Sequence, residues 1–145
     1  MKLLIDESIV IFDLEAESKV EVISKLAKKM HEQERITNLD GYIKAVLERE
    51  DSFSTAVGFG VATPHAKTDC AKCASVAFAR LKHPIKWDDE DVSIIFQLAV
   101  PQKDAGERHL IILASLARKL MHEEFREQIM SATNPKEILE LIGEI

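Results

Sequence analysis

The sequence predicts an α/β protein, a single domain in which a mixed β-sheet is flanked by α-helices and the C-terminal region is helical. β-prone runs are interspersed with stretches of helical periodicity, which is typical of a sheet covered by helices. From Arg108 onward the pattern is helical throughout. The 145 residues suit one hydrophobic core and leave no room for two, so we expect a single domain over residues 1–145.

Composition and charge exclude several classes of protein. A net charge of −6 argues against nucleic acid or an anionic membrane as partner, because both require clustered Lys and Arg. The longest apolar runs, such as Ile94–Val100, are far too short to span a bilayer. The chain starts with early acids (Asp6, Glu7) and lacks the pattern of a signal peptide, and two cysteines make no disulfide scaffold. We therefore expect a cytoplasmic protein with no direct membrane insertion.

The first elements are expected to be a peripheral strand and a helix. Ser8–Phe12 is a short β-prone run suited to the edge of the sheet. Ser18 and Glu21 form a capping box, in which the hydroxyl caps the helix and the carboxylate follows three residues later. The helix should run to about Glu32. Its inward stripe is formed by Val22, Ile23, Leu26, Ala27 and Met30.

A second helix should follow, capped by Asn38 or Asp40. Its apolar residues at helical spacing are Tyr42, Ile43, Val46 and Leu47. The helix delivers Arg49 and Glu50 at its end, where a cation in the last turn is also favoured by the helix dipole.

The segment after this helix combines two hydroxyls, two glycines and a histidine that directly follows a proline. Pro64 restricts its own φ and biases Thr63 toward extended geometry. His65 is therefore expected where a strand stops and a loop begins. A histidine held on a rigid turn can act as nucleophile, base or ligand, because its imidazole titrates near neutral pH.

The second half of the chain should supply the main strands. Ala74–Arg80 is typical of a half-buried strand. His83–Asp91 is predicted to be a turn-rich, solvated acidic loop that contains the only tryptophan. Val92–Val100 is apolar enough for a central strand, and Pro101 ends it.

After a polar loop over Gln102–Glu107, three helices are expected. The first begins at Arg108 or His109, which places His109 in a first turn where backbone N–H groups favour an anion. Its apolar positions are Leu110, Leu113, Ala114, Ala117 and Leu120, widened by Ile111, Ile112 and Leu116. Glu123–Met130 and a helix capped by Asn134 close the chain.

The central segment resembles the phosphorylation-site signature of enzyme IIA domains of the fructose/mannitol type, from the sugar phosphotransferase system (PTS). The matching residues are Glu50, then after six spacers Val57 and Gly58, then after two spacers Val61, Ala62, Thr63, Pro64, His65 and Ala66. Thr63 departs from the usual aliphatic residue. Ala56 and Phe59 depart from the glycine and asparagine of the wider family run.

The similarity extends from about residue 15 to the end of the chain. Ile85–Asp88 resembles the family's apolar-x-Trp loop, while Leu98–Pro101 and His109–Leu110 resemble its strand, loop and second histidine. The resemblance implies a phosphoryl carrier that accepts from phospho-HPr and passes the group to a cysteine of enzyme IIB. It implies a sugar of the fructose, mannitol or galactitol type, and neither cofactor nor metal.

The resemblance also assigns the site residues. His65 would be the phosphorylated nucleophile, and Arg49 would offer a permanently charged fork to the phosphoryl oxygens. Thr55, or less surely Ser54, would donate a hydroxyl hydrogen bond to the phosphoryl group or orient the imidazole. His109 would add a donor from across the sheet edge. Each of these residues also has an ordinary structural interpretation, as helix-end, turn or surface residue.

Two alternatives remain open from the residues themselves. His65, Cys70 and Cys73 place three soft ligands within nine residues, which is compatible with a zinc-binding module. Alternatively, the chain is a regulatory, nitrogen-related phosphocarrier that acts by protein binding. Ala56 and Phe59 depart from the run typical of those members, which favours the sugar-uptake role.

Overall fold

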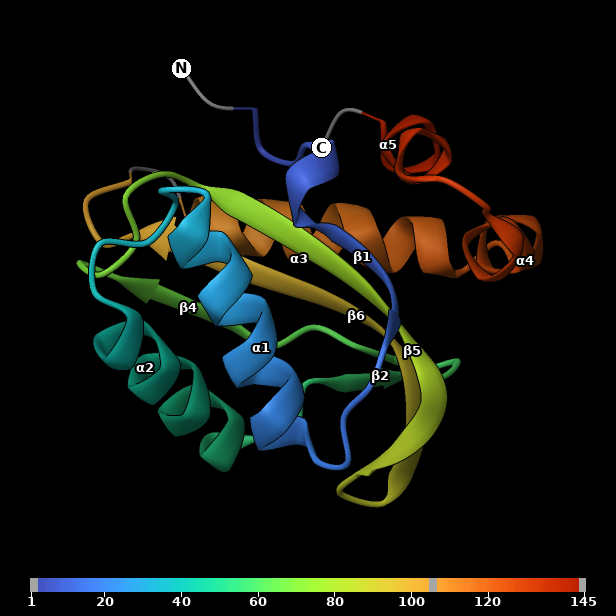
Figure 1. Cartoon of the computed structure of the whole chain (residues 1–145), viewed down its shortest axis with the longest axis horizontal. Coiled ribbons are helices and arrows are strands. Elements are labelled where there is room, and N and C mark those ends of the chain that lie inside the picture. The colour runs from blue at the N-terminus through green and yellow to red at the C-terminus, as the bar shows by residue number, and fades with distance from the viewer. Residues whose placement is uncertain (1–2, 105–106, 144–145) are drawn as a thin grey trace.

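The computed structural model describes residues 3–104 and 107–143. Within these ranges the chain forms one six-stranded mixed sheet and five α-helices (Figure 1), which confirms the predicted mixed sheet flanked by helices. The predicted polar loop over Gln102–Glu107 includes residues 105 and 106, which lie outside the described ranges.

The elements alternate along the chain before the helices take over. The strands are β1 (Val10–Leu14), β2 (Ala56–Gly58), β3 (Val61–Ala62), β4 (His65–Thr68), β5 (Ser75–Trp87) and β6 (Glu90–Pro101). The helices are the short 3₁₀ turn η1 (Glu7–Ile9), α1 (Lys19–Glu32), α2 (Leu39–Ser52), α3 (Arg108–Leu120), α4 (Glu123–Ser131) and α5 (Pro135–Ile142).

β6 is the central strand, and every other part of the sheet is placed relative to it. On one side it pairs antiparallel with β5, and β5 pairs parallel with β1 at the edge. On its other side β6 pairs in parallel with two short strands in succession, β3 and then β4. Thr63 and Pro64 separate these two strands, because proline lacks the N–H that a continuous ladder needs.

Helix starts follow the capping residues that the sequence contains. Ser18 caps α1 by accepting from the Glu21 N–H at 3.2 Å. Asn38, not Asp40, caps α2 by accepting from the Gly41 N–H at 2.9 Å. Asn134 caps α5, with Pro135 in its first turn. These side-chain oxygens satisfy N–H groups that have no partner within the helix, so the predicted starts are confirmed.

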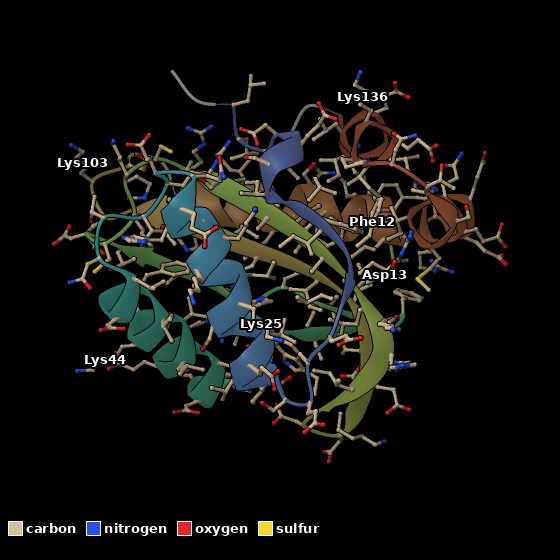
Figure 2. The ribbon with its side chains drawn as sticks, in the orientation of Figure 1. Phe12, Asp13, Lys25, Lys44, Lys103 and Lys136 are labelled. Carbon is tan, nitrogen blue, oxygen red and sulfur yellow. The ribbon has the colours of Figure 1, made fainter. Side chains whose placement is uncertain are left out.

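The core lies between the sheet and the helices. α1 crosses in front of the sheet and α3 passes behind it, while α2 packs against β4 (Figure 1). The predicted inward stripe of α1 is fully buried. Phe78 and Phe96 pack edge-to-face on neighbouring strands with ring centroids 5.3 Å apart, a favourable arrangement for two aromatic rings. Lys44, Lys103 and Lys136 extend outward from the surface (Figure 2).

The predicted acidic loop over His83–Asp91 is wrong. β5 continues to Trp87, and a two-residue turn at Asp88 and Asp89 leads directly into β6. Asp88 has a φ of 58°, a left-handed conformation that aspartate tolerates in tight hairpin turns. The ladder shifts register between Arg80 and Ile85, which accommodates Pro84 within the strand.

The predicted buried face of α3 needs correction as well. Ile112, Leu116 and Leu120 are buried, but Leu110 and Ile111 are more than half exposed. Leu113, Ala114 and Ala117 line surface clefts described below. Some of the apolar residues that recur along α3 therefore line a surface cleft, and only part of them pack in the core.

A buried guanidinium ties the N-terminal segment to the body of the domain. Arg35, in the turn between α1 and α2, is 0% exposed and donates to Asp6 at 2.8 Å, to the Ser75 hydroxyl at 2.9 Å and to the Leu4 carbonyl at 3.3 Å. Burial alone would raise the pKa of Asp6, but hydrogen bonds from Ser8 and Arg35 outweigh it and hold that pKa below its ordinary value.

A second arginine joins β5 to α4. Nη1 of Arg80 donates to the carbonyls of Ile129, Met130 and Ala132 at 3.1, 3.2 and 2.9 Å. It thereby satisfies carbonyls at the end of the helix, which have no N–H partner further along the chain. Its guanidinium carbon lies 4.3 Å from the centroid of the Phe12 ring on β1, which is labelled in Figure 2, within the range of a cation–π contact.

Across the described ranges, every helix is too short or too polar to cross a membrane.

Arg35→Ala should lower the free energy of unfolding by about 3 kcal/mol or more, because the change opens a cavity and removes the donor to the Asp6 carboxylate and the Ser75 hydroxyl. Urea denaturation measures this change. Lys82→Ala is the control, since its ion pair with Glu15 is exposed at both ends. The expected loss in that variant is below about 1 kcal/mol. Equal losses in the two variants would contradict a special role for Arg35.

Candidate functional site

His65 opens β4, directly after the break in the sheet. It pairs with Leu98 of β6 and is 7% exposed, so it lies in the sheet and not in a loop after a strand. Its Nδ1 lies 2.9 Å from the carbonyl oxygen of Thr63. Because a carbonyl can only accept, Nδ1 carries the proton and Nε2 keeps its lone pair. The local backbone therefore selects the tautomer in which Nε2 is the nucleophilic nitrogen.

The surroundings of His65 also keep its ring neutral. Burial lowers the pKa of His65 below its ordinary value, because desolvation disfavours the imidazolium. The hydrogen bond to Thr63 opposes this effect, and the nearby charges of Arg49 and His109 lower the pKa further, while Glu50 raises it. At neutral pH the ring is thus an uncharged nucleophile.

Two clefts meet at His65. The α2–α3 cleft has a volume of about 550 Å³ and is lined by Ala45, Glu48, Arg49, Ser52, His65, Ala66, Lys67, His109, Leu110 and Leu113. The hairpin cleft, of about 340 Å³, is lined by Arg49, Ser54, Thr55, Val57, Thr63, His65, Leu113, Ala114, Ala117 and Leu120. Arg49 and His65 line both clefts, so the predicted cation lies where a group on His65 would need it.

Arg49 lies in the last turn of α2, as predicted. Its Nη1 donates to the carbonyl of Phe53 at 2.9 Å, which ties the guanidinium to the loop that follows the helix. A guanidinium carries five N–H donors, so this one bond leaves others for the oxygens of an anion.

His109 faces the same cleft from the first turn of α3. Its ring is stacked with that of His65, with centroids 6.2 Å apart and 29° between the planes. Nε2 lies 3.6 Å from a carboxylate oxygen of Glu107, and Nδ1 is buried without a hydrogen-bond partner among the described residues. The second predicted histidine therefore lies beside the first, and its Nδ1 can form a hydrogen bond with a ligand.

Thr55 lies at the site but is already engaged. Its backbone N–H and its hydroxyl both donate to the carboxylate of Glu50, at 2.8 Å and 2.5 Å. A hydroxyl has a single proton, so in this arrangement Thr55 does not donate to a group on His65. Ser54 is the exposed hydroxyl of the pair, and it also lines the hairpin cleft.

Glu50 is the residue for which sequence reasoning assigned no role. It is buried at the end of α2 and accepts a third hydrogen bond from the indole of Trp87 at 3.1 Å. Glu50 is the acidic residue of the signature, and this position was a feature of the sequence that could have pointed to a role for it. Its partner Trp87 was hidden by the expectation of a loop at the end of β5.

The hairpin of β2 and β3 forms one border of the site. Gly58, Phe59 and Gly60 at its tip all have positive φ, at 89°, 57° and 74°. Phe59 is strained there, because a bulky residue seldom adopts the left-handed region. The Arg126 guanidinium carbon lies 4.0 Å from the centroid of the Phe59 ring, and this cation–π contact offsets part of the strain. The geometry explains why glycine and asparagine suit this run in the related family.

The zinc alternative has no structural support. Cys70 and Cys73 are half-buried and reduced, and Cys73 Sγ contacts the Ser75 hydroxyl at 3.7 Å. Within residues 3–104 and 107–143, no group of three or more His, Cys, Asp or Glu side chains is arranged to hold a metal ion.

Comparison with known protein families gives a match over nearly the whole chain. The family described as "Phosphoenolpyruvate-dependent sugar phosphotransferase system, EIIA 2" matches residues 3–145. The chain is 40% identical over 114 residues to the PTS system fructose-specific EIIA component of Haloferax volcanii, covering 77% of this chain and 73% of that protein. It is 34% identical over 131 residues to the PTS system 2-O-alpha-mannosyl-D-glycerate-specific EIIABC component of Escherichia coli K12, covering 88% of this chain but only 20% of that protein.

Solved structures share the fold. The nitrogen regulatory protein IIA-Ntr from Neisseria meningitidis superposes with a TM-score of 0.88 at 29% identity, covering 97% of both chains. Enzyme IIA for mannitol from Escherichia coli, solved in complex with phosphorylated enzyme IIB, has a TM-score of 0.81 at 21% identity, covering 97% of this chain and 96% of that one. The resemblance inferred from Glu50 to Ala66 is thereby confirmed, and the chain belongs to the EIIA type 2 family of the phosphoenolpyruvate-dependent sugar phosphotransferase system.

Proposed function

We propose that this chain carries a phosphoryl group on Nε2 of His65, accepting it from phospho-HPr and passing it to a cysteine of an enzyme IIB. The observation that carries the proposal is the hydrogen bond from His65 Nδ1 to the Thr63 carbonyl, which leaves the lone pair on Nε2 beside a cation and a second histidine. Membership of the family supports both partners, and the solved complex of a related IIA with phosphorylated IIB supports the acceptor.

The transfer conserves atoms and charge. The Nε2 lone pair forms a P–N bond as the P–N bond of the donor breaks, and the donor ring, protonated at its other nitrogen, leaves as neutral imidazole. The phosphorylated His65 ring keeps its proton on Nδ1 and becomes positive, and the Thr63 carbonyl accepts that more acidic proton in a hydrogen bond. A cysteine thiolate then forms an S–P bond as the P–N bond breaks, which returns His65 to its starting form.

Arg49 and His109 supply the charge and donors that such a transfer requires. Phosphoryl transfer passes through a loose transition state in which positioning and charge stabilisation provide most of the catalysis. Arg49 borders both clefts at His65 and retains N–H donors for equatorial oxygens. His109 adds a donor from the stacked ring, at the start of a helix whose dipole favours an anion.

We infer a role in sugar uptake within one cytoplasmic domain spanning residues 1–145. The sequence relatives at 40% and 34% identity carry names specific for fructose and for mannosylglycerate, which supports a sugar of the fructose type. The structural similarity to IIA-Ntr reflects the shared fold and leaves the regulatory role as the second candidate. Co-purification of an enzyme IIB would favour uptake, whereas a kinase or channel would favour regulation.

Incubation with phosphoenolpyruvate, enzyme I and HPr should add one phosphoryl group to the intact protein, stable in base and lost in acid. His65→Ala should abolish the gain, because it removes the nucleophile. His83→Ala is the matched control and should be phosphorylated normally, since that histidine is exposed on β5. Intact mass measures both. Normal phosphorylation of a folded His65→Ala protein would refute the assignment.

Arg49→Ala should reduce the rate of phosphoryl acceptance by about 100- to 1,000-fold, the usual effect of losing one charge-stabilising donor. The variant should still fold, because Arg49 is only half-buried at a helix end. Rapid-quench kinetics with phospho-HPr measure the rate, and circular dichroism checks the fold. A rate within about threefold of the original would exclude Arg49 from the site.

The depressed pKa of His65 should be visible by titration. Because burial disfavours the charged ring, the imidazolium should form only at a pH below the ordinary value of 6.5, so phosphoryl acceptance persists as pH falls toward that value. An NMR titration of His65, compared with a short peptide containing Pro64–Ala66, measures the difference. Titration at or above the pH of the peptide would contradict the buried, neutral ring.

A further inference from the structure

The carboxylate of Glu50 is buried, and burial is energetically costly for a charged group. Its side chain is 1% exposed, and an ionised carboxylate is poorly tolerated in such a place unless donors surround it. Three donors do so: the Thr55 N–H at 2.8 Å, the Thr55 hydroxyl at 2.5 Å and the Trp87 indole at 3.1 Å. Nζ of Lys19 approaches to 4.0 Å. The carboxylate therefore links four parts of the fold, namely the end of α2, the loop that precedes β2, strand β5 and helix α1.

From this carboxylate a continuous chain of hydrogen bonds leads to the reacting imidazole. The carbonyl of Thr55 accepts from the N–H of Thr63 at 2.9 Å, and weakly from the Thr63 hydroxyl at 3.4 Å. The carbonyl of Thr63 accepts in turn from Nδ1 of His65 at 2.9 Å. The carbonyl that selects the tautomer of His65 is thus held in place through Thr55 and Glu50.

We propose that Glu50, itself held by Trp87, is a positioning residue for phosphoryl transfer: it anchors Thr55 so that the Thr63 carbonyl keeps the lone pair of His65 on Nε2. Glu50 contacts none of the reacting atoms and acts only through other residues. The inference rests on the proposed function of His65, and it assigns to the acidic signature residue a role that composition and spacing did not reveal.

The chemistry of the three donors explains why a carboxylate is needed here. Two oxygens accept from three donors, whereas a glutamine would turn its NH₂ group toward at least one of them. The negative charge of Glu50 also favours the positive ring that His65 acquires when phosphorylated, consistent with its raising effect on the pKa of His65. Arg49 precedes Glu50 in α2, so the hydrogen bonds that hold Glu50 also fix the backbone from which the Arg49 guanidinium extends.

Glu50→Gln tests the proposal, with Asp51→Asn as the matched control that makes the same charge change at an exposed neighbour on α2. In the folded Glu50→Gln protein, the rate constant for phosphoryl acceptance should fall about 10- to 100-fold, the effect of a misplaced reacting group. The KM for phospho-HPr should change by less than about threefold, because the docking surface is untouched. Asp51→Asn should behave as the unmodified protein.

A structural role alone would leave the His65 tautomer unchanged, so ¹⁵N NMR of labelled histidine is the decisive readout. The unmodified protein should show Nδ1 protonated and Nε2 unprotonated, and Glu50→Gln should show a mixture of both forms. An unchanged tautomer together with a transfer rate within about twofold would overturn the proposal. Because the NMR experiment needs no phosphoryl donor, it still tests the positioning if phospho-HPr fails to phosphorylate the unmodified protein, the result that would refute the proposed function.

Trp87→Phe keeps the inference testable if Glu50→Gln does not fold. This change removes one N–H donor from the carboxylate and keeps an aromatic ring in the core. Its transfer rate should fall by about three- to tenfold, the range expected for one hydrogen bond, with a partial shift in the His65 tautomer. A folded Trp87→Phe protein with normal rate and tautomer would count against the chain of hydrogen bonds from Trp87 to His65.

Discussion

The hydrogen bond between His65 Nδ1 and the carbonyl of its near neighbour Thr63 determines what the cleft can do. A histidine on a mobile loop would exchange its proton between both nitrogens, and either could react. Here the break at Thr63 and Pro64 turns one carbonyl toward the ring, and the parallel pairing of β4 with β6 fixes the backbone on the other side. The choice of tautomer is therefore made by a carbonyl of the backbone at this break in the sheet.

The charges around this bond differ from those of the protein as a whole. The protein has a net charge of −6, yet the groups closest to His65 include Arg49 and His109, and the nearby carboxylate of Glu50 is buried and fully engaged. The surroundings of His65 are thus locally cationic on an acidic protein. Such surroundings disfavour the imidazolium form of His65 and would favour an anion beside it.

The fold class and the helix caps could be predicted from sequence, because they depend on local signals, and so could the break in the sheet just before His65. Ser18, Asn38 and Asn134 cap helices through contacts within three residues, and Pro64 interrupts a strand wherever it lies. The errors concern contacts between distant residues. Asp88 and Asp89 resemble a solvated loop until the pairing of Ile85 with Val92 shows a hairpin, and the apolar face of α3 resembles core until the clefts beside His65 are seen.

The hydroxyl of Thr55 illustrates the same limit at the site. Its place beside His65 follows from the signature, but its partner does not, because Glu50 reaches it only after α2 has ended and the chain has turned back. The residue is better described as part of the frame than as a donor to the ligand. Sequence patterns report which side chains gather at a site more readily than which hydrogen bonds each of them already makes.

Trp87 is the single tryptophan of the chain, and its indole is bonded to the carboxylate that leads to His65. Almost all long-wavelength ultraviolet fluorescence of the protein therefore originates at one end of this chain of hydrogen bonds. The emission of an indole responds to nearby charge, and the carboxylate of Glu50 is the charged group to which Trp87 donates. The fluorescence of this one residue therefore reports on the surroundings of Glu50 in solution without any label.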